Sequence, residues 1–268
     1  MRIRQLSMML VILALSGSSA LFAQSMGESM MMKGTTTKRA SMKASANHEM
    51  KDLVKFKVRI ENISSADGFT ASNGMKWPFA ISPGAYTVHY GSGKPFFVVG
   101  KSAANTGLEA QAEDGNPEML VATASHHSGV MTKGIFNTPV GQMKPGPVGP
   151  GAAFEFEVMA RPGAHLYLTF MFGQSNDLFF GNRNAISLFD ANGKPFSGDV
   201  AARVELWDAG TEVNEEPGIG ANQAPRQKAA NTGMAERKAV GMVKDGFTYP
   251  KTTDVLRIVV TPEVGGMM

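Results

Sequence analysis

Hydrophobic and polar side chains alternate along several short stretches of this chain. In residues 55–61, Phe56, Val58 and Ile60 occupy every second position, and charged side chains fill the positions between them. A period of two residues is typical of a β-strand that buries one of its faces. We predict further strands at 154–158, 203–207 and 255–260, a strand buried on both faces at 166–170, and weaker strands at 86–90, 95–99 and 119–123.

Turn-forming residues separate these stretches, and no long helical pattern alternates with them. Pro-Gly pairs at 83–84 and 162–163 and an Asn-Gly pair at 192–193 interrupt regular structure. One short helix is expected within 105–112. A parallel α/β sheet would need a long helical crossover between successive strands. The sequence therefore predicts an all-β fold, an antiparallel β-sandwich of about eight strands with long loops.

The first 52 residues differ in composition from the rest of the chain. Residues 1–23 combine two arginines, a short apolar stretch and small residues before Gln24, which is typical of a secretory signal peptide. The apolar stretch is shorter than the roughly 20 residues that span a bilayer. Residues 24–52 are rich in Met, Ser and Lys and predict a flexible linker. We expect a folded domain at 53–268, periplasmic or secreted, without a membrane span after signal cleavage.

Charge and cysteine content exclude several classes of function. Residues 53–268 contain 19 basic and 20 acidic side chains, so the folded part is nearly neutral although the whole chain carries a net charge of +3. Nucleic-acid binding needs a clustered basic face, and none is expected. The chain contains no cysteine, which excludes disulfides, zinc-thiolate sites and a cysteine nucleophile. The domain must therefore be stabilised by its core, to which a bound ion can add.

A long polar stretch, residues 215–244, precedes the final predicted strand. It is rich in Gly, Ala and Asn and lacks aromatic residues. Loops of this length in compact domains are usually functional or mobile. We expect a mobile excursion from the sandwich.

Three acidic residues lie close to the ends of predicted strands. Asp177 follows the strand at 166–170, and Asp208 and Glu212 follow the strand at 203–207. A sandwich gathers its loops at its two ends. With backbone carbonyls and water, these carboxylates would offer a hard cation such as Ca²⁺ the oxygen ligands that it prefers. Solvated loop acids are the competing interpretation of the same residues.

Four motifs in this order resemble the spondin N-terminal domain family. They are Gly-Leu-Glu-Ala-Gln-Ala-Glu-Asp-Gly at 107–115, Ser-Asn-Asp-Leu-Phe-Phe-Gly at 175–181, Leu-Phe-Asp-Ala-Asn-Gly at 188–193 and Asp-Ala-Gly-Thr-Glu at 208–212. The resemblance extends over about residues 54–262. It implies a C2-like β-sandwich outside the cell with a Ca²⁺ at one end, for which Asp177, Asp208 and Glu212 would be the metal ligands.

The chain departs from the family pattern at several points. Leu178 stands where the family commonly has Trp, and Glu212 is one methylene longer than the aspartate often found. The disulfides of animal members have no counterpart in this chain. The receptors and matrix polysaccharides that animal members bind are therefore a weak guide to its partner. The resemblance implies a non-enzymatic binding or adhesion module whose partner is an unknown extracellular protein or surface polymer.

Two alternatives use other chemistry. A secreted metal-dependent hydrolase would activate water at Asp177 or Asp208. A periplasmic metal-handling protein would bind Cu(I) through the methionines of 24–52. The His126-His127 pair is a poor metal site, because neighbouring side chains of a strand point to opposite faces. No catalytic partner is visible for Glu113 or Asp114, so no catalytic residue is assigned.

Overall fold

The computed structural model describes residues 53–91, 93, 95–124 and 129–263. The expected signal peptide at 1–23, the Met-rich linker at 24–52 and the His126-His127 pair lie outside the described residues. Predictions about them therefore stay predictions. No helix among the described residues has both the length and the apolar character needed to cross a membrane.

Strands dominate the described chain. Eight of them have four or more residues, and short helices and two-residue strands lie between them. The longer strands are β1 (Val54–Asn62), β4 (Ile81–Tyr90), β5 (Val130–Phe136), β6 (Ala153–Ala160), β7 (Ala164–Phe172), β8 (Leu178–Gly181), β11 (Glu205–Asp208) and β13 (Leu256–Glu263). The shorter elements are β2 (Phe69–Thr70), β3 (Lys76–Trp77), α2 (Leu108–Asp114), α3 (Glu118–Ala124), β9 (Ile186–Ser187), β10 (Gly198–Asp199), η1 (Ala201–Arg203), β12 (Gly241–Met242) and α4 (Thr252–Val255).

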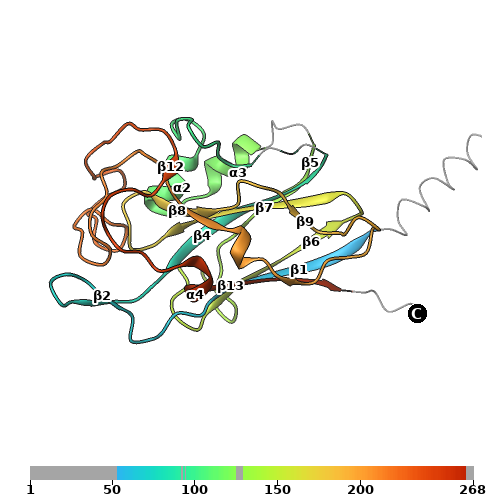
Figure 1. Ribbon diagram of the computed structural model, residues 1–268, viewed down its shortest axis with the longest axis horizontal. Helices are drawn as coiled ribbons and strands as arrows, with labels where there is room; N and C mark the ends of the chain where they lie inside the picture. The colour runs from blue at the N-terminus through green and yellow to red at the C-terminus, as the bar shows by residue number, and fades with distance from the viewer. Residues whose placement is uncertain (1–52, 92, 94, 125–128, 264–268) are drawn as a thin grey trace, which may run out of the picture. The chain divides into compact units, whose positions relative to one another are not determined.

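The strands form two antiparallel sheets with a core between them (Figure 1). One sheet has the order β10-β13-β1-β6, and the other has the order β12-β11-β8-β7-β4-β5, with β9 paired to β7. Strands β2 and β3 form a separate hairpin. This architecture confirms the prediction of an all-β antiparallel sandwich.

Strand β1 shows how the alternating pattern becomes a sheet with two different faces. Phe56, Val58 and Ile60 are fully buried between the sheets. The residues between them face outward and pair across the sheet, because β1 lies between β6 and β13. Lys55 contacts Glu157 at 3.0 Å and Glu263 at 2.6 Å. Such exposed ion pairs stabilise a fold only slightly, so the buried face fixes the register.

Strand β7 is buried on both faces, as its sequence predicted. Leu168 and Phe170 face the core between the sheets, whereas Tyr167 belongs to a second hydrophobic cluster on the outer face of the larger sheet. Helices α2 and α3 supply Leu108 and Leu120 to this second cluster. The helices thus cover one face of the larger sheet, and a strand buried on both faces results.

Two weaker strand predictions are wrong. Residues 119–123 belong to α3, where Pro117 precedes the first turn and the side chain of Asn116 accepts a hydrogen bond from the Glu118 amide at 3.1 Å. Such a cap and a proline are typical helix-start features. Residues 95–99 form a loop that presses Phe96 and Phe97 into the second cluster. Short apolar runs do not distinguish these possibilities by periodicity alone.

The polar stretch 215–244 has almost no regular secondary structure, but side chains of its first part, 215–226, are held by buried hydrogen bonds, which differs from the mobile excursion expected there. Gln223 is fully buried, and its side-chain amide donates to the carbonyls of Glu215 at 3.0 Å and Glu216 at 2.8 Å. Arg226 donates to the Gln174 side chain at 2.9 Å. Burial of long polar side chains depends on tertiary partners, so composition alone did not reveal it.

The end of β1 provides a test of how buried amides hold the loops. Asn62 is fully buried, and its side chain donates to the carbonyls of Phe79 at 2.9 Å and Val148 at 3.2 Å. Asn62→Ala is expected to lower the free energy of unfolding by about 2 kcal/mol, because both carbonyls lose a buried donor. Urea unfolding measures this change. Asn192→Ala, at an exposed position, should change stability by less than about 0.5 kcal/mol; equal effects would contradict the assignment.

Candidate functional site

The predicted metal ligands lie on two segments that a strand pair brings together. Asp177 lies directly before β8, and Asp208 is the last residue of β11. These strands pair antiparallel, with Asp208 opposite Leu178. The amide of Ala209 donates to the carbonyl of Asp177 at 3.2 Å. The turn before β8 and the segment after β11 are therefore neighbours, as the loop argument predicted.

Asp177 is the buried centre of this site. Its side chain is 0% exposed. The Oδ2 atom accepts hydrogen bonds from the backbone amides of Thr211 at 2.7 Å and Glu212 at 3.0 Å, and from the Thr211 hydroxyl at 3.2 Å. The Oδ1 atom is buried without a hydrogen-bond partner. The Oδ2 atom thus binds the 208–212 segment, whereas the Oδ1 atom has no hydrogen-bond partner among the described residues.

Asp208 is only partly buried and has both carboxylate oxygens engaged. Oδ1 accepts from the Gly210 amide at 2.7 Å, and Oδ2 accepts from the Asn214 side chain at 2.9 Å. Gly210 has a φ of 70°, and an added Cβ would lie 2.8 Å from the Lys238 carbonyl. Only glycine fits this backbone without strain. The glycine of the 208–212 motif is therefore needed for the turn that positions Asp208.

Glu212 is a further buried acid of the same segment. Its side chain is 2% exposed, and its Oε1 atom accepts from the Gly233 amide at 2.8 Å. Its Oε2 atom has no hydrogen-bond partner. A Cβ added at Gly233 would collide with this carboxylate. Through this hydrogen bond, Glu212 connects the part of the 215–244 stretch around Gly233 to the segment that follows β11.

Glu113 is a further member of the site, which sequence reasoning did not assign. It lies on α2 with 2% of its side chain exposed, and its Oε1 atom has no hydrogen-bond partner. The Thr211 side chain, whose hydroxyl donates to Asp177, also influences Glu113 by lowering its pKa. The motif at 107–115 contained Glu113, but nothing in one sequence showed that α2 lies against the 208–212 segment.

The pKa values of the four acids are all raised. Burial is the largest cause at each, because removal from water disfavours the charged form. It raises the pKa of Asp177 to about 7, with the charge of Asp208 adding to the effect. It also raises the pKa of Glu113 to about 7, with Glu212 and Asp177 contributing. Burial therefore favours the protonated forms of these carboxyls.

The unpartnered atoms of the site are all hydrogen-bond acceptors. They are Glu113 Oε1, Asp177 Oδ1, Glu212 Oε2 and Asn214 Oδ1. Buried polar atoms in folded proteins normally have a partner, so such a set requires an explanation. Bound protons would satisfy the carboxylates, and a hard cation would satisfy carboxylates and amide alike. The donor set therefore fits an oxygen-ligated ion.

The side-chain geometry limits what kind of ion site this can be. Among the described residues, no group of three or more His, Cys, Asp or Glu side chains is arranged to hold a metal by itself. An ion at Asp177 would therefore need the Asn214 amide, backbone carbonyls and water to complete its shell. Ca²⁺ accepts such mixed oxygen shells, whereas Zn²⁺ sites in proteins are mostly built from Cys and His.

A second polar cluster, the 215–226 network, extends from Asn176. Asn176 Oδ1 accepts from the Glu215 amide at 3.0 Å. Glu215 in turn accepts from the Asn222 amide at 2.8 Å and from its side chain at 3.0 Å. The turn that holds Asp177 therefore also fixes the long loop, and any ligand at Asp177 would act on both.

Comparison of the chain with models of known protein families and with curated proteins gave no match.

Proposed function

We propose that this chain is a spondin-type, secreted or periplasmic binding module without catalytic activity, and that a Ca²⁺ held at Asp177, Asp208 and Glu212 stabilises its loops. One observation carries the ion: four buried acceptor oxygens without partners lie around the 208–214 segment. Their type matches the preference of Ca²⁺ for oxygen ligands, and backbone carbonyls and water would have to supply the rest of its six to eight ligands. The resemblance of the 175–181 and 208–212 motifs to spondin domains supports the same residues.

Burial supports a structural ion over a hydrolytic one. Asp177, Glu212 and Glu113 have between 0% and 2% of their side chains exposed. A metal-activated water must reach both the ion and a substrate. The pockets lined by Phe97, by Pro217 and by Leu206 include none of these acids. A buried ion instead joins α2, the β8–β11 pair and the long loop.

The ion would act on the surface that the long loop forms. Glu212 accepts a hydrogen bond from the Gly233 amide, and Asn176 accepts one from the Glu215 amide. Both halves of this loop are therefore attached to residues of the proposed ion site or next to it. A ligand that binds only the folded state stabilises it by mass action. The loop is then ordered for contact with an extracellular protein or a surface polymer, which is the partner class we propose.

Thermal unfolding with and without Ca²⁺ tests the ion. Millimolar Ca²⁺, compared with excess EDTA, is expected to raise the unfolding midpoint by about 5 °C, since a ligand at 100 times its Kd adds about 2.7 kcal/mol. Asp208→Asn should remove most of this shift, because it removes one ligand charge. Asp190→Asn is the matched control. Asp190 accepts amide hydrogen bonds from Asn192 and Lys194 in an exposed turn, so the full Ca²⁺ shift should remain.

An unchanged midpoint in the natural protein would overturn the ion, and protonation would then account for the unpartnered oxygens. An equal shift in both variants would place Ca²⁺ elsewhere. Pull-down with envelope polymers in Ca²⁺ and in EDTA tests the binding role. Turnover that is lost in Asp208→Asn while the fold is kept would replace the binding module with the hydrolase.

A further inference from the structure

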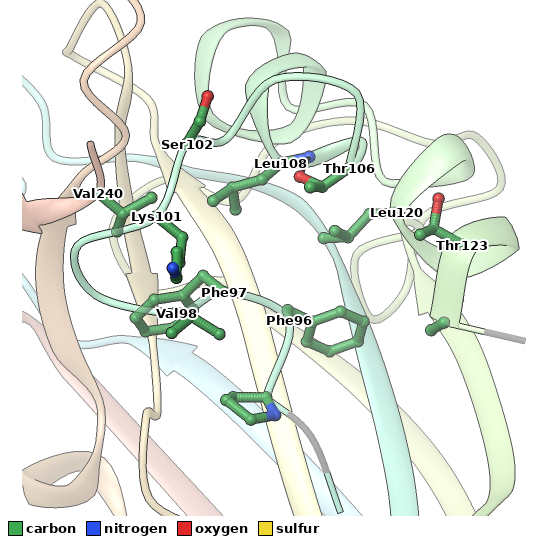
Figure 2. A pocket seen from close by; sticks show the side chains of 12 residues that line it. Phe96, Phe97, Val98, Lys101, Ser102, Thr106, Leu108, Leu120, Thr123 and Val240 are labelled. Carbon is green, nitrogen blue, oxygen red and sulfur yellow. Dashed lines mark hydrogen bonds between the residues drawn. The ribbon is translucent and has the colours of Figure 1, made fainter. Parts of the chain in front are cut away.

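An apolar pocket lies on the outer face of the larger sheet and is not lined by any of the four acids. It is enclosed by the loop after residue 95, by α2 and α3, and by Val240 (Figure 2). Its volume is about 170 Å³. The proposed Ca²⁺ role does not use it, so any ligand here would constitute a separate binding function.

Large hydrophobic side chains form the walls of this pocket. Figure 2 shows Phe96, Phe97, Leu108 and Leu120 around one common space. Each of them is buried in the folded chain. An apolar cavity of roughly 150 Å³ holds one benzene molecule and stays free of water. The pocket therefore has room for one six-membered ring, or for a chain of about six carbons.

Three hydroxyl groups line the pocket, and they differ in whether their hydrogen is already used in a hydrogen bond. The Thr106 hydroxyl donates to the Ala103 carbonyl at 2.6 Å, and the Thr123 hydroxyl donates to the Met119 carbonyl at 2.9 Å, so both hydrogens are committed. The Ser102 hydroxyl only accepts, from the Ala104 amide at 3.2 Å, and keeps its hydrogen. Among these three hydroxyls, only that of Ser102 can still donate a hydrogen bond.

Lys101 supplies a positive charge at the same place. It lines the pocket, and no ion pair or side-chain hydrogen bond of its amine is found with any of the described residues. Its backbone is fixed, because its amide donates to the Val98 carbonyl at 3.0 Å and its carbonyl accepts from the Val240 amide at 2.9 Å. A cation on a fixed backbone beside an apolar pocket favours an anionic head on an apolar body.

The pocket is formed before any ligand arrives. The Gly100 amide donates a hydrogen bond to the Val240 carbonyl at 2.8 Å, which attaches the loop after residue 95 to the segment that contains Val240. The Phe97 ring packs against Phe179 at 5.0 Å and Trp207 at 5.2 Å between ring centroids. A rigid apolar pocket loses little conformational entropy on binding. Ligand pockets are usually of this kind, apolar with a few convergent polar groups.

We propose that this pocket binds a small monocarboxylate whose apolar body is one ring or about six carbons. The body lies among Phe96, Phe97, Leu108 and Leu120, and the carboxylate accepts from the Lys101 amine, which points toward Phe97 in Figure 2.

Calorimetric titration of the full chain with benzoate and with benzyl alcohol tests this assignment. The two probes share a ring of equal size, and only benzoate carries the charge. Benzoate is expected to bind at least tenfold more tightly. Lys101→Met should lower benzoate affinity about tenfold, or about 1.4 kcal/mol, and leave benzyl alcohol unchanged. Lys144→Met, at an exposed position away from the pocket, is the matched control and should change neither affinity.

Other results would overturn the proposal. Equal binding of both probes, or an unchanged benzoate affinity in Lys101→Met, would remove the carboxylate preference. Absence of binding by benzoate, hexanoate and benzyl alcohol at millimolar concentration would remove the ligand site. Binding of a phenylalanine-containing peptide but not of benzoate would show that a protein side chain is the occupant. Titrations in EDTA and in Ca²⁺ separate this outcome from failure of the ion site, because the proposed benzoate contacts include none of its acids.

Discussion

Replacement of Asp177 by alanine is expected to lower the free energy of unfolding by about 3–5 kcal/mol, the scale of removing one partner of a buried charged contact. The Oδ2 atom of Asp177 accepts from the amides of Thr211 and Glu212 and from the Thr211 hydroxyl. Alanine would leave these donors buried without an acceptor. The 208–212 segment would also lose its attachment to the turn before β8. Urea unfolding in Ca²⁺ and in EDTA measures the loss and its ion-dependent part.

Two further variants show whether the loss comes from the buried contacts. Asp190→Ala also removes a carboxylate that accepts two backbone amides, at 2.8 Å and 2.9 Å, but Asp190 is exposed and water can replace it. It should cost about 1 kcal/mol. Asp177→Asn keeps the shape and one acceptor oxygen, so it should be less destabilising than alanine but abolish the Ca²⁺ shift. Equal losses in Asp177→Ala and Asp190→Ala would show that burial at Asp177 contributes nothing.

The alternating positions of the chain were enough to predict the sandwich. Strand β1 follows from Phe56, Val58 and Ile60 alone, because a period of two residues places these side chains on one face. The same argument failed at 119–123, where three apolar residues in a row fit a helix or a strand equally well. The helix follows from Asn116 and Pro117, which together form a helix-start signal.

The site was predictable only in part. Motif positions indicated that Asp177, Asp208 and Glu212 lie on neighbouring loops, and the β8–β11 register places them there. The direction of each carboxylate could not be derived, because it depends on which amides the turn of Gly210 presents. Glu113 was missed for a related reason. Its burial follows from the packing of α2 on the larger sheet, which is a long-range contact without a local sequence signal.

In the absence of Ca²⁺, the domain is expected to lose stability as the pH rises from 5 to 8. Burial raises the pKa of Asp177 and of Glu113 to about 7 in the folded state, above the ordinary values of 3.8 for Asp and 4.5 for Glu, which apply to the unfolded chain. Between the lower pKa of the unfolded state and the raised pKa of the folded state, the folded state binds more protons than the unfolded state. The free energy of unfolding therefore falls as the pH rises. The loss is roughly 3 kcal/mol for each of the two carboxyls over this range, since one pKa unit corresponds to about 1.4 kcal/mol.

Calcium should remove this dependence, because a bound cation replaces the protons and favours the charged carboxylates. Urea unfolding from pH 5 to 8 in EDTA and in Ca²⁺ measures both curves, with Asp177→Asn expected to flatten the EDTA curve. The exposed ion pairs lower the pKa of Glu263, so their contribution is lost only at more acidic pH, outside this window. Stability in EDTA that rises from pH 5 to 8 would mean that the buried carboxylates are charged without an ion, against their environment.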